Sequence, residues 1–186
     1  IDRNDEVGDL MIAFNAMARG LEERQLIRRM VSSGARQGAE GAVSSSGEYR
    51  DVTILLLGSR IAETAGNSAA TLFQGLNRQL AEVSRLAALE QGDIDKVIGE
   101  KVLLVFSHTS GEADAAQRAL RTLEALARAT TEDRLPFLWS AGLHSGVVIS
   151  GCLGAGNRQD FTVIGDTVNT AARLESLAGK APEPHV

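Results

Sequence analysis

The stretch from Asp160 to Arg173, DFTVIGDTVNTAAR, limits the possible folds more than any other part of this sequence. Phe161 to Ile164 is aromatic and β-branched, as in a strand, and a helical pattern follows the polar turn at Gly165. Asp166 and Thr167 are of the residue types that cap helix N-termini. The sequence therefore predicts that a strand leads directly into a helix whose start is rich in polar groups.

The predicted helix carries two polar side chains on one face. Asn169 and Arg173 are four residues apart, so an amide and a guanidinium project from neighbouring turns. A guanidinium donates two parallel hydrogen bonds to phosphate oxygens, and an amide can both donate to and accept from a hydroxyl. This pair therefore suits the binding of a sugar beside a phosphate.

Charge and cysteine content exclude several classes of protein. The net charge of -5 and the pI near 5.3 argue against a general nucleic-acid-binding protein, which would show a basic patch. Only three lysines occur, namely Lys96, Lys101 and Lys180. Cys152 is the only cysteine, which excludes an intrachain disulfide, and we interpret it as a small residue of the core.

Apolar residues in the first 31 positions follow a coiled-coil pattern, with alternating spacings of three and four along Val7, Leu10, Phe14, Met17 and Leu21. The repeat then changes phase, which in a coiled coil marks a place where two helix packings compete. A single amphipathic helix lying on its own domain explains the spacing equally well. A Gly-, Ser- and Ala-rich linker is predicted over 32–50, between this helix and the rest of the chain.

The segment DEVGDLMIAFNAM, within Asp5 to Glu23, resembles the second helix of a HAMP signal-relay module, which joins a membrane receptor to a cytoplasmic output domain. The resemblance implies a homodimer with parallel N-terminal helices and a location as the cytoplasmic domain of a membrane-bound bacterial receptor. The chain starts at Ile1 without an initiator methionine and shows no signal peptide or run of membrane-spanning length. We therefore interpret it as a piece of a longer protein.

Residues 51–186 are predicted to form one domain with strands and helices in alternation. The expected elements are a buried strand in VTILLLG, a helix over Ala69–Gln91, a hairpin turning at Gly99-Glu100, a helix over Glu112–Thr130 and a strand pair turning at Ser145-Gly146. The second helix is expected to bury Ala116, Leu120, Leu123 and Ala127. The cluster of Gly151, Gly154 and Gly156 is interpreted as a further turn. Hairpins between helices predict an α+β fold in which helices cover one mixed sheet.

Four blocks of this domain, VTILLLGSRI, IDKVIGEKVLLVF, SAGLHSGVVISGCLG and DFTVIGDTVNTAARLE, resemble in order and spacing the catalytic domain of class III nucleotidyl cyclases. These are the adenylyl and guanylyl cyclases, and the resemblance covers Asp51 to about Leu177. It implies a ferredoxin-like, palm-type αβ domain. It also implies that two such domains associate head to tail, with active sites at their interface.

The resemblance assigns roles to individual residues. Lys96 matches the lysine that recognises adenine, and Thr162 matches the second base-selecting position, so ATP is the implied ligand. A lysine donor and a hydroxyl can address the ring nitrogen and the amino group of adenine. Asn169 matches the residue that orients the ribose, and Arg173 the one that stabilises charge on the phosphate as the 3′ hydroxyl attacks.

The departures from the family concern its two metal ions, expected to be Mg²⁺ or Mn²⁺. The family places one aspartate just past the first strand and one in the hairpin turn, where this chain has Gly58 and Glu100. A longer carboxylate at 100 can still serve as a metal ligand, but a glycine at 58 supplies no side-chain ligand. The family's late phosphate-binding lysine would lie beyond Val186, so the domain is interpreted as C-terminally truncated.

Two interpretations follow. The favoured one is an adenylyl cyclase-like output domain under HAMP control, with a degenerate metal site and weak or lost activity. The alternative is a working adenylyl cyclase that uses Glu100, or one that forms a heterodimer with an intact cyclase domain. A diguanylate cyclase is disfavoured because the hairpin reads Ile98-Gly99-Glu100-Lys101 and contains no GGDEF-like turn.

Overall fold

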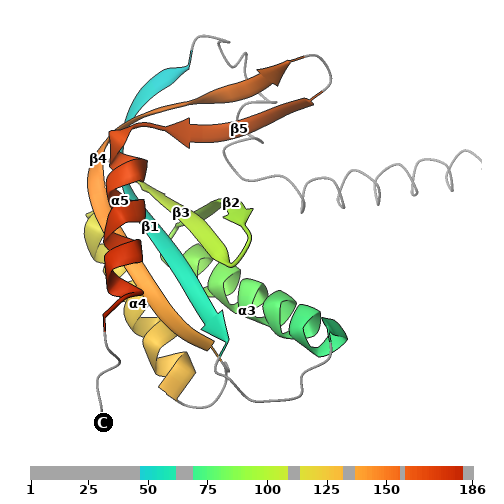
Figure 1. Ribbon diagram of the computed structural model, residues 1–186. Coiled ribbons are helices and arrows are strands. Elements are labelled where there is room, and N and C mark those ends of the chain that lie inside the picture. The colour runs from blue at the N-terminus through green and yellow to red at the C-terminus, as the bar shows by residue number, and fades with distance from the viewer. Residues whose placement is uncertain (1–46, 62–68, 109–113, 132–136, 156–157, 182–186) are drawn as a thin grey trace, which may run out of the picture.

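The computed structural model describes residues 47–61, 69–108, 114–131, 137–155 and 158–181 (Figure 1). The predicted HAMP-like helix of 1–31 and most of the linker predicted over 32–50 lie outside these ranges. The first strand starts at Glu48, before the end of the predicted linker.

The described residues form five strands and three helices. In chain order they are β1 (Glu48–Ile61), α3 (Ala69–Leu89), β2 (Asp93–Ile98), β3 (Lys101–Ser107), α4 (Ala115–Thr131), β4 (Phe137–Ala155), β5 (Arg158–Ile164) and α5 (Asp166–Ala178). The strands make one sheet in the order β2-β3-β1-β4-β5. This confirms the α+β, palm-type fold, but every pairing is antiparallel, so the sheet is not the mixed one that the sequence suggested.

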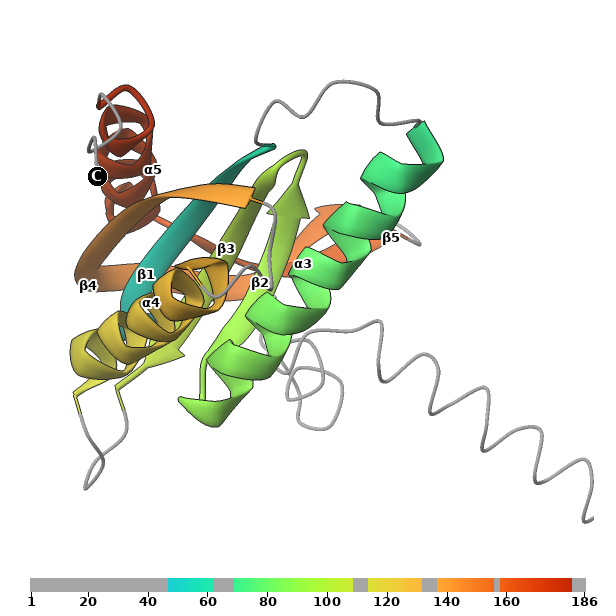
Figure 2. The same ribbon diagram turned by 90° about the horizontal axis from the view of Figure 1, so that it is seen from below.

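The central strand β1 has apolar side chains on both faces, as its dense apolar sequence predicts. Leu55 and Leu57 belong to the core beneath α3 and α4, whereas Val52, Ile54 and Leu56 belong to the core beneath α5. Figure 2 shows α3 and α4 on one side of the sheet and α5 on the other. The sheet is therefore the middle layer of three. None of the helices that the structure describes has the length and hydropathy needed to span a membrane.

Helix α4 buries a different face from the predicted one. Leu120, expected in the core, is 48% exposed, whereas the fully buried positions are Ala115, Ala119, Thr122 and Leu126. The buried face also includes Arg118, whose guanidinium donates to the carbonyl oxygens of Ser107 and Glu90. Because this face contains a threonine and an arginine, counting apolar residues selected the wrong side of the helix.

Strand β4 runs without a break through Ser145 and Gly146, so the turn predicted there is wrong. These small residues reflect packing: a Cβ at Gly146 would lie 2.8 Å from Thr167 Oγ1 of α5, and Ser145 Oγ is 2.8 Å from Thr53 Oγ1 of β1. Gly151 and Gly154 also lie within β4, whereas Gly156 is outside the described residues.

Cys152, interpreted from the sequence as a core residue, is instead exposed on β4 where that strand pairs with β5. The curvature of β4 carries this paired segment across the top of the sheet (Figure 1). As a result β5, at one edge of the sheet, contacts β2, at the opposite edge. This contact of the two edges positions the candidate site.

Candidate functional site

The strand-to-helix unit predicted from Asp160 to Arg173 is present as β5 and α5, but its cap differs. Gly165 is the N-cap residue, α5 begins at Asp166, and no side chain caps the helix. Thr167, expected as a cap, instead donates a hydrogen bond of 2.8 Å to the carbonyl oxygen of Val147, which ties α5 to β4. Asp166 lies in the first turn, where a negative charge is favoured by the helix dipole.

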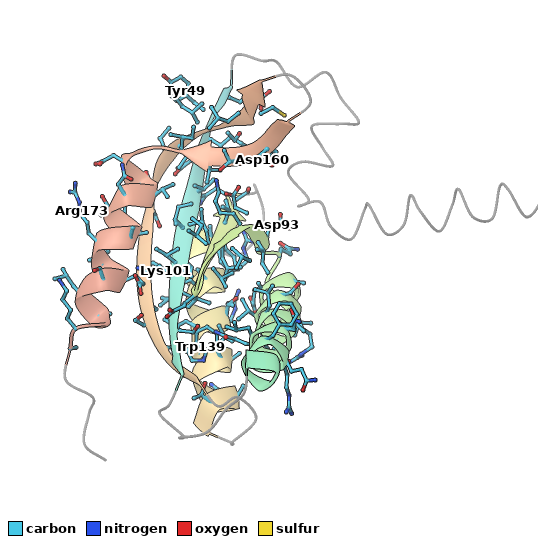
Figure 3. All side chains as sticks on the ribbon, turned by 45° about the vertical axis from the view of Figure 1, so that its right-hand side comes forward. Tyr49, Asp93, Lys101, Trp139, Asp160 and Arg173 are labelled. Carbon is cyan, nitrogen blue, oxygen red and sulfur yellow. The ribbon has the colours of Figure 1, made fainter. Side chains whose placement is uncertain are left out.

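Asn169 and Arg173 are both exposed. Figure 3 shows Arg173 on the side of α5 that faces away from the sheet. The opposite side of the same helix packs closely on β4, because a Cβ at Gly142 would lie 2.0 Å from the carbonyl oxygen of Ala171. The closely packed helix therefore presents this amide and this guanidinium to solvent.

Lys96 of β2 and Thr162 of β5, 66 residues apart in the chain, are brought together across the two edges of the sheet. The Lys96 ammonium donates a hydrogen bond to Thr162 Oγ1. Thr162 Oγ1 in turn donates to Asp95 Oδ2 at 3.1 Å, and Lys96 Nζ lies 3.5 Å from the same oxygen. These three side chains form what we call the Lys96 cluster.

Asp95 was not predicted as a site residue. In a regular strand Asp95 and Lys96 would point to opposite faces, but the pairing of β2 with β3 shifts register between Ile94 and Lys96. This bulge lets both side chains reach Thr162. The only sequence signal for Asp95 as a site residue was its position next to the candidate lysine, Lys96. The bulge that turns its side chain toward Thr162 has no distinct sequence pattern here.

Burial raises the pKa of the Asp95 carboxyl above its ordinary value, and the charge of Lys96 and the hydrogen bonds from Thr162 and Lys96 offset this only in part. Its side chain is 5% exposed. A small cavity of about 40 Å³ adjoins Asp95, with Arg50 and the apolar side chains of Val52, Val105 and Phe161 in its wall. The cluster thus combines an ammonium, a hydroxyl and a carboxylate beside an apolar surface on the α5 side of the sheet.

The metal positions expected at Gly58 and Glu100 lie at the other end of β1. Gly58 pairs with Lys101 of β3, and a Cβ at Gly58 would be 2.0 Å from Glu175 Oε1 and 2.6 Å from Ser140 Oγ. The space that an aspartate at 58 would need is therefore filled by the Glu175 carboxylate of α5.

Glu175 is held in place by two donors. Lys101 Nζ donates to Glu175 Oε2 at 2.5 Å, and Ser140 Oγ donates to Glu175 Oε1 at 2.6 Å. Burial alone would raise the pKa of this carboxyl, but the hydrogen bonds from Lys101 and Ser140 and the charge of Lys101 outweigh it, so its pKa is lowered. We call Gly58, Lys101, Ser140 and Glu175 the Glu175 cluster. No local pattern in the sequence predicts this arrangement.

Glu100 occupies the predicted turn between β2 and β3, where Gly99 adopts a φ of 60°. The Glu100 side chain is exposed, and its carbonyl oxygen accepts hydrogen bonds from Ser59 N at 3.2 Å and Ser59 Oγ at 3.1 Å. Among the described residues, no three His, Cys, Asp or Glu side chains gather as a metal site. The residues present therefore do not fit a pair of metal ions.

Comparison with known proteins now identifies the family. The family model described as Adenylate and Guanylate cyclase catalytic domain matches residues 46–182. The chain therefore belongs to the adenylate and guanylate cyclase catalytic domain family.

Individual relatives agree with this assignment. The chain is 31% identical over 187 residues to the uncharacterized protein Rv1320c of Mycobacterium tuberculosis, with 95% of the chain and 32% of that protein covered. It is 30% identical over 187 residues to an adenylate cyclase of Anabaena cylindrica, with 94% of the chain and 37% of that enzyme covered. The chain thus spans about a third of the length of these curated relatives.

A solved structure agrees as well. The adenylyl cyclase CyaB from P. aeruginosa is 26% identical and superposes with a TM-score of 0.59, covering 70% of this chain and 73% of that one.

Proposed function

We propose that this chain is an adenylyl cyclase-like signalling output domain that binds ATP and in which cyclisation to cyclic AMP and pyrophosphate is weak or lost. The observation that carries the proposal is the contrast between the Lys96 cluster, which is assembled, and the position of Gly58, which is filled by Glu175. The family membership supplies the reaction class.

In this proposal the Lys96 cluster reads the adenine base. Lys96 would exchange its hydrogen bond with Thr162 for one to a ring nitrogen, and the Thr162 hydroxyl and the Asp95 carboxylate would accept from the exocyclic amino group. Asn169 and Arg173, exposed on α5, would contact the ribose and the phosphate of a nucleotide shared with a partner chain. A homodimer with parallel N-terminal helices is part of the proposal, as is HAMP control from a membrane-bound receptor.

The impaired turnover follows from the Glu175 cluster. Magnesium requires short oxygen contacts in near-octahedral geometry, and Gly58 offers no side chain for them. Glu175 cannot substitute, because both of its oxygens already accept hydrogen bonds, from Lys101 and Ser140.

The test measures ATP binding and product separately. Calorimetric titration of the purified chain with ATP should show binding, which Lys96→Met weakens about tenfold through the loss of a charged hydrogen bond. Lys180→Met, which removes an exposed lysine outside the cluster, is the matched control and should bind as the parent does. With ATP and manganese, the chain should form no cyclic AMP above a heat-killed blank. Clear formation of cyclic AMP would contradict the proposed loss of activity, and absence of ATP binding would contradict the proposed nucleotide site.

A second candidate is a working cyclase that uses Glu100, alone or completed by an intact partner chain. One observation favours it: the backbone of Glu100 is fixed by Ser59 while its carboxylate is exposed to solvent and to any partner. This candidate predicts metal-dependent cyclic AMP formation that Glu100→Gln abolishes.

A further inference from the structure

A cavity of about 160 Å³ lies on the face of the sheet opposite α5, between the helix α3 and the β2–β3 hairpin. Its walls include Leu80 and Val102, which belong to the core beneath α3 and α4. Figure 2 shows α3 lying along this side of β2 and β3. The cavity is therefore separate from the Lys96 cluster, which lies on the α5 side. Its remaining walls come from Ser59, Leu76, Asn77, Gln79, Val97, Gly99 and Glu100.

Gln79 in this wall is only 3% exposed, and its amide oxygen Oε1 accepts no hydrogen bond from the part of the chain that the structure describes. Nearly all buried polar atoms in folded proteins are paired, because leaving one without a partner after its removal from water is costly. Gln79 lies one helical turn before Val83, on the face of α3 that is otherwise apolar and buried. An aliphatic residue would satisfy the packing there, so the amide points to a donor that the described residues do not provide.

The chemistry of the walls limits that donor. Leu76, Leu80, Val97 and Val102 offer apolar contact. Among the described residues no lysine or arginine lines the cavity, so these walls offer an anion no counter-charge. Ser59 Oγ already donates to the carbonyl of Glu100. Apolar side chains at the hairpin continue to the surface, since Val97 is 46% and Ile98 60% exposed. A cavity of this size accepts a molecule with one or two small rings.

We propose that this cavity binds a small neutral molecule with a flat apolar body and one N–H or O–H donor, which Gln79 Oε1 accepts. The apolar body displaces water from the leucine and valine side chains, and the donor pairs the buried carbonyl. This site goes beyond the proposed nucleotide function and does not depend on it.

Three probes of nearly equal shape test the proposal: indole carries an N–H donor, benzofuran carries only an acceptor, and indene carries neither. Indole should bind the whole chain saturably and about tenfold more tightly than indene, because only indole pairs the carbonyl. Backbone amide signals of Leu76, Gln79 and Val97 should shift in NMR spectra, whereas those of Tyr49, on β1, should not. Equal affinity for indole and indene, or tighter binding of benzofuran, would overturn the proposal.

Two variants locate the donor contact. Gln79→Leu should bind indole and indene with equal affinity, whereas Gln74→Leu, which changes an exposed glutamine of the same helix, should keep the preference. Leu76→Phe places a ring inside the cavity and should abolish binding of all three probes while far-UV circular dichroism stays unchanged. A preference for indole that survives in Gln79→Leu, or binding that survives in Leu76→Phe, also rejects the site. ATP titration of the same variants gives a separate readout, which should not change.

Discussion

Two buried carboxylates at different places on the α5 side of the sheet each sit beside a lysine, yet their pKa values move in opposite directions. Asp95 and Glu175 are equally hidden, with side chains 5% exposed. Glu175 accepts a bond of 2.5 Å from Lys101 and another of 2.6 Å from Ser140, and its pKa is lowered. The pKa of Asp95 is raised by burial, with Lys96 Nζ 3.5 Å away and Thr162 Oγ1 at 3.1 Å.

We propose that this difference separates a structural pair from a binding pair. The short hydrogen bonds from Lys101 of β3 and Ser140 of β4 stabilise the charge of Glu175, as expected of a group that fastens α5 to these two strands. At Asp95 burial outweighs the charge of Lys96 and the hydrogen bonds that the carboxylate accepts, so an incoming donor would relieve a cost that remains, as expected of a group kept for binding. Four predictions test this division, from the largest expected effect to the smallest.

The largest effect is expected from Gly58→Asp. The new Cβ would lie 2.0 Å from Glu175 Oε1, and a second carboxylate would enter the same buried space. Overpacking and like-charge repulsion together should lower the free energy of unfolding by about 3–5 kcal/mol, measured by urea denaturation. Gly58→Ala, which adds the Cβ without the charge, should lose about 1–3 kcal/mol.

The double variant Gly58→Asp with Glu175→Ala checks the cause. Removing Glu175 vacates the space, so the two changes should cost less together than the sum of their separate effects. Additive costs would show that Glu175 is not the obstacle. Restoring the family aspartate therefore tests catalysis only in the double variant, because the single one is expected to be poorly folded.

The second prediction compares the removal of each lysine, by its effect on stability and on ATP affinity. Lys101→Met should lower the free energy of unfolding by about 1–2 kcal/mol, less than a fully buried pair would lose because Lys101 is 44% exposed. Lys96→Met should lower the free energy of unfolding by no more than about 1 kcal/mol, because Lys96 Nζ lies 3.5 Å from Asp95 Oδ2, farther than Lys101 Nζ lies from Glu175 Oε2. ATP affinity should respond in the opposite order, falling for Lys96→Met and holding for Lys101→Met. Lys180→Met should change neither the free energy of unfolding nor the ATP affinity. If both quantities fell together in Lys96→Met and in Lys101→Met, the division into a binding and a structural cluster would be contradicted.

The sequence was a good guide wherever neighbouring residues determine the structure. The Gly99-Glu100 turn was predictable because a glycine separates two apolar runs, and Gly99 indeed adopts a positive φ. The dense apolar run after Asp51 identified the central strand. Lys96, Thr162, Asn169 and Arg173 were singled out as binding residues, and the structure brings Lys96 and Thr162 into contact. Their roles in binding a nucleotide stay predictions.

The misses all involve contacts between distant parts of the chain. Gly146 resembled a turn residue, but it is small because α5 packs directly on β4, as the close approach of α5 at Gly142 also shows. Asp95 was overlooked because a bulge reverses the direction of one side chain. Glu175 lies 117 positions after Gly58, by subtraction of the two residue numbers, and no local pattern indicates that its carboxylate would fill the space of a missing aspartate.

The third prediction concerns pH, and its sign differs between the two carboxylates. The folded pKa of Glu175 lies below its ordinary value of 4.5, so its contribution to stability is complete above pH 4.5 and is lost as the pH falls through the folded value. Asp95 has a folded pKa above its ordinary value of 3.8, so its ionised form costs stability at neutral pH and protonation relieves that cost as the pH falls.

Urea denaturation between pH 3 and pH 8 compares the parent with Glu175→Gln and Asp95→Asn. The deficit of Glu175→Gln relative to the parent should shrink below pH 4.5, whereas the stability of the parent relative to Asp95→Asn should rise as the pH falls. If both stability differences between parent and variant changed in the same direction as the pH falls, the two clusters would not differ in the way proposed. Ser176→Ala, an exposed change beside Glu175, should run parallel to the parent throughout.

The smallest effect is expected from Glu100→Gln, and that small effect is what makes it informative. The exposed carboxylate forms no hydrogen bond or ion pair with the described residues, and the hairpin is fixed through the Glu100 carbonyl rather than its side chain. Stability should stay within about 0.5 kcal/mol of the parent, and ATP affinity should not change. Glu124→Gln, an exposed glutamate on α4, is the matched control. If the parent forms cyclic AMP with manganese and only Glu100→Gln abolishes it, then Glu100 is a working ligand and the impaired domain proposed above is in fact an active cyclase.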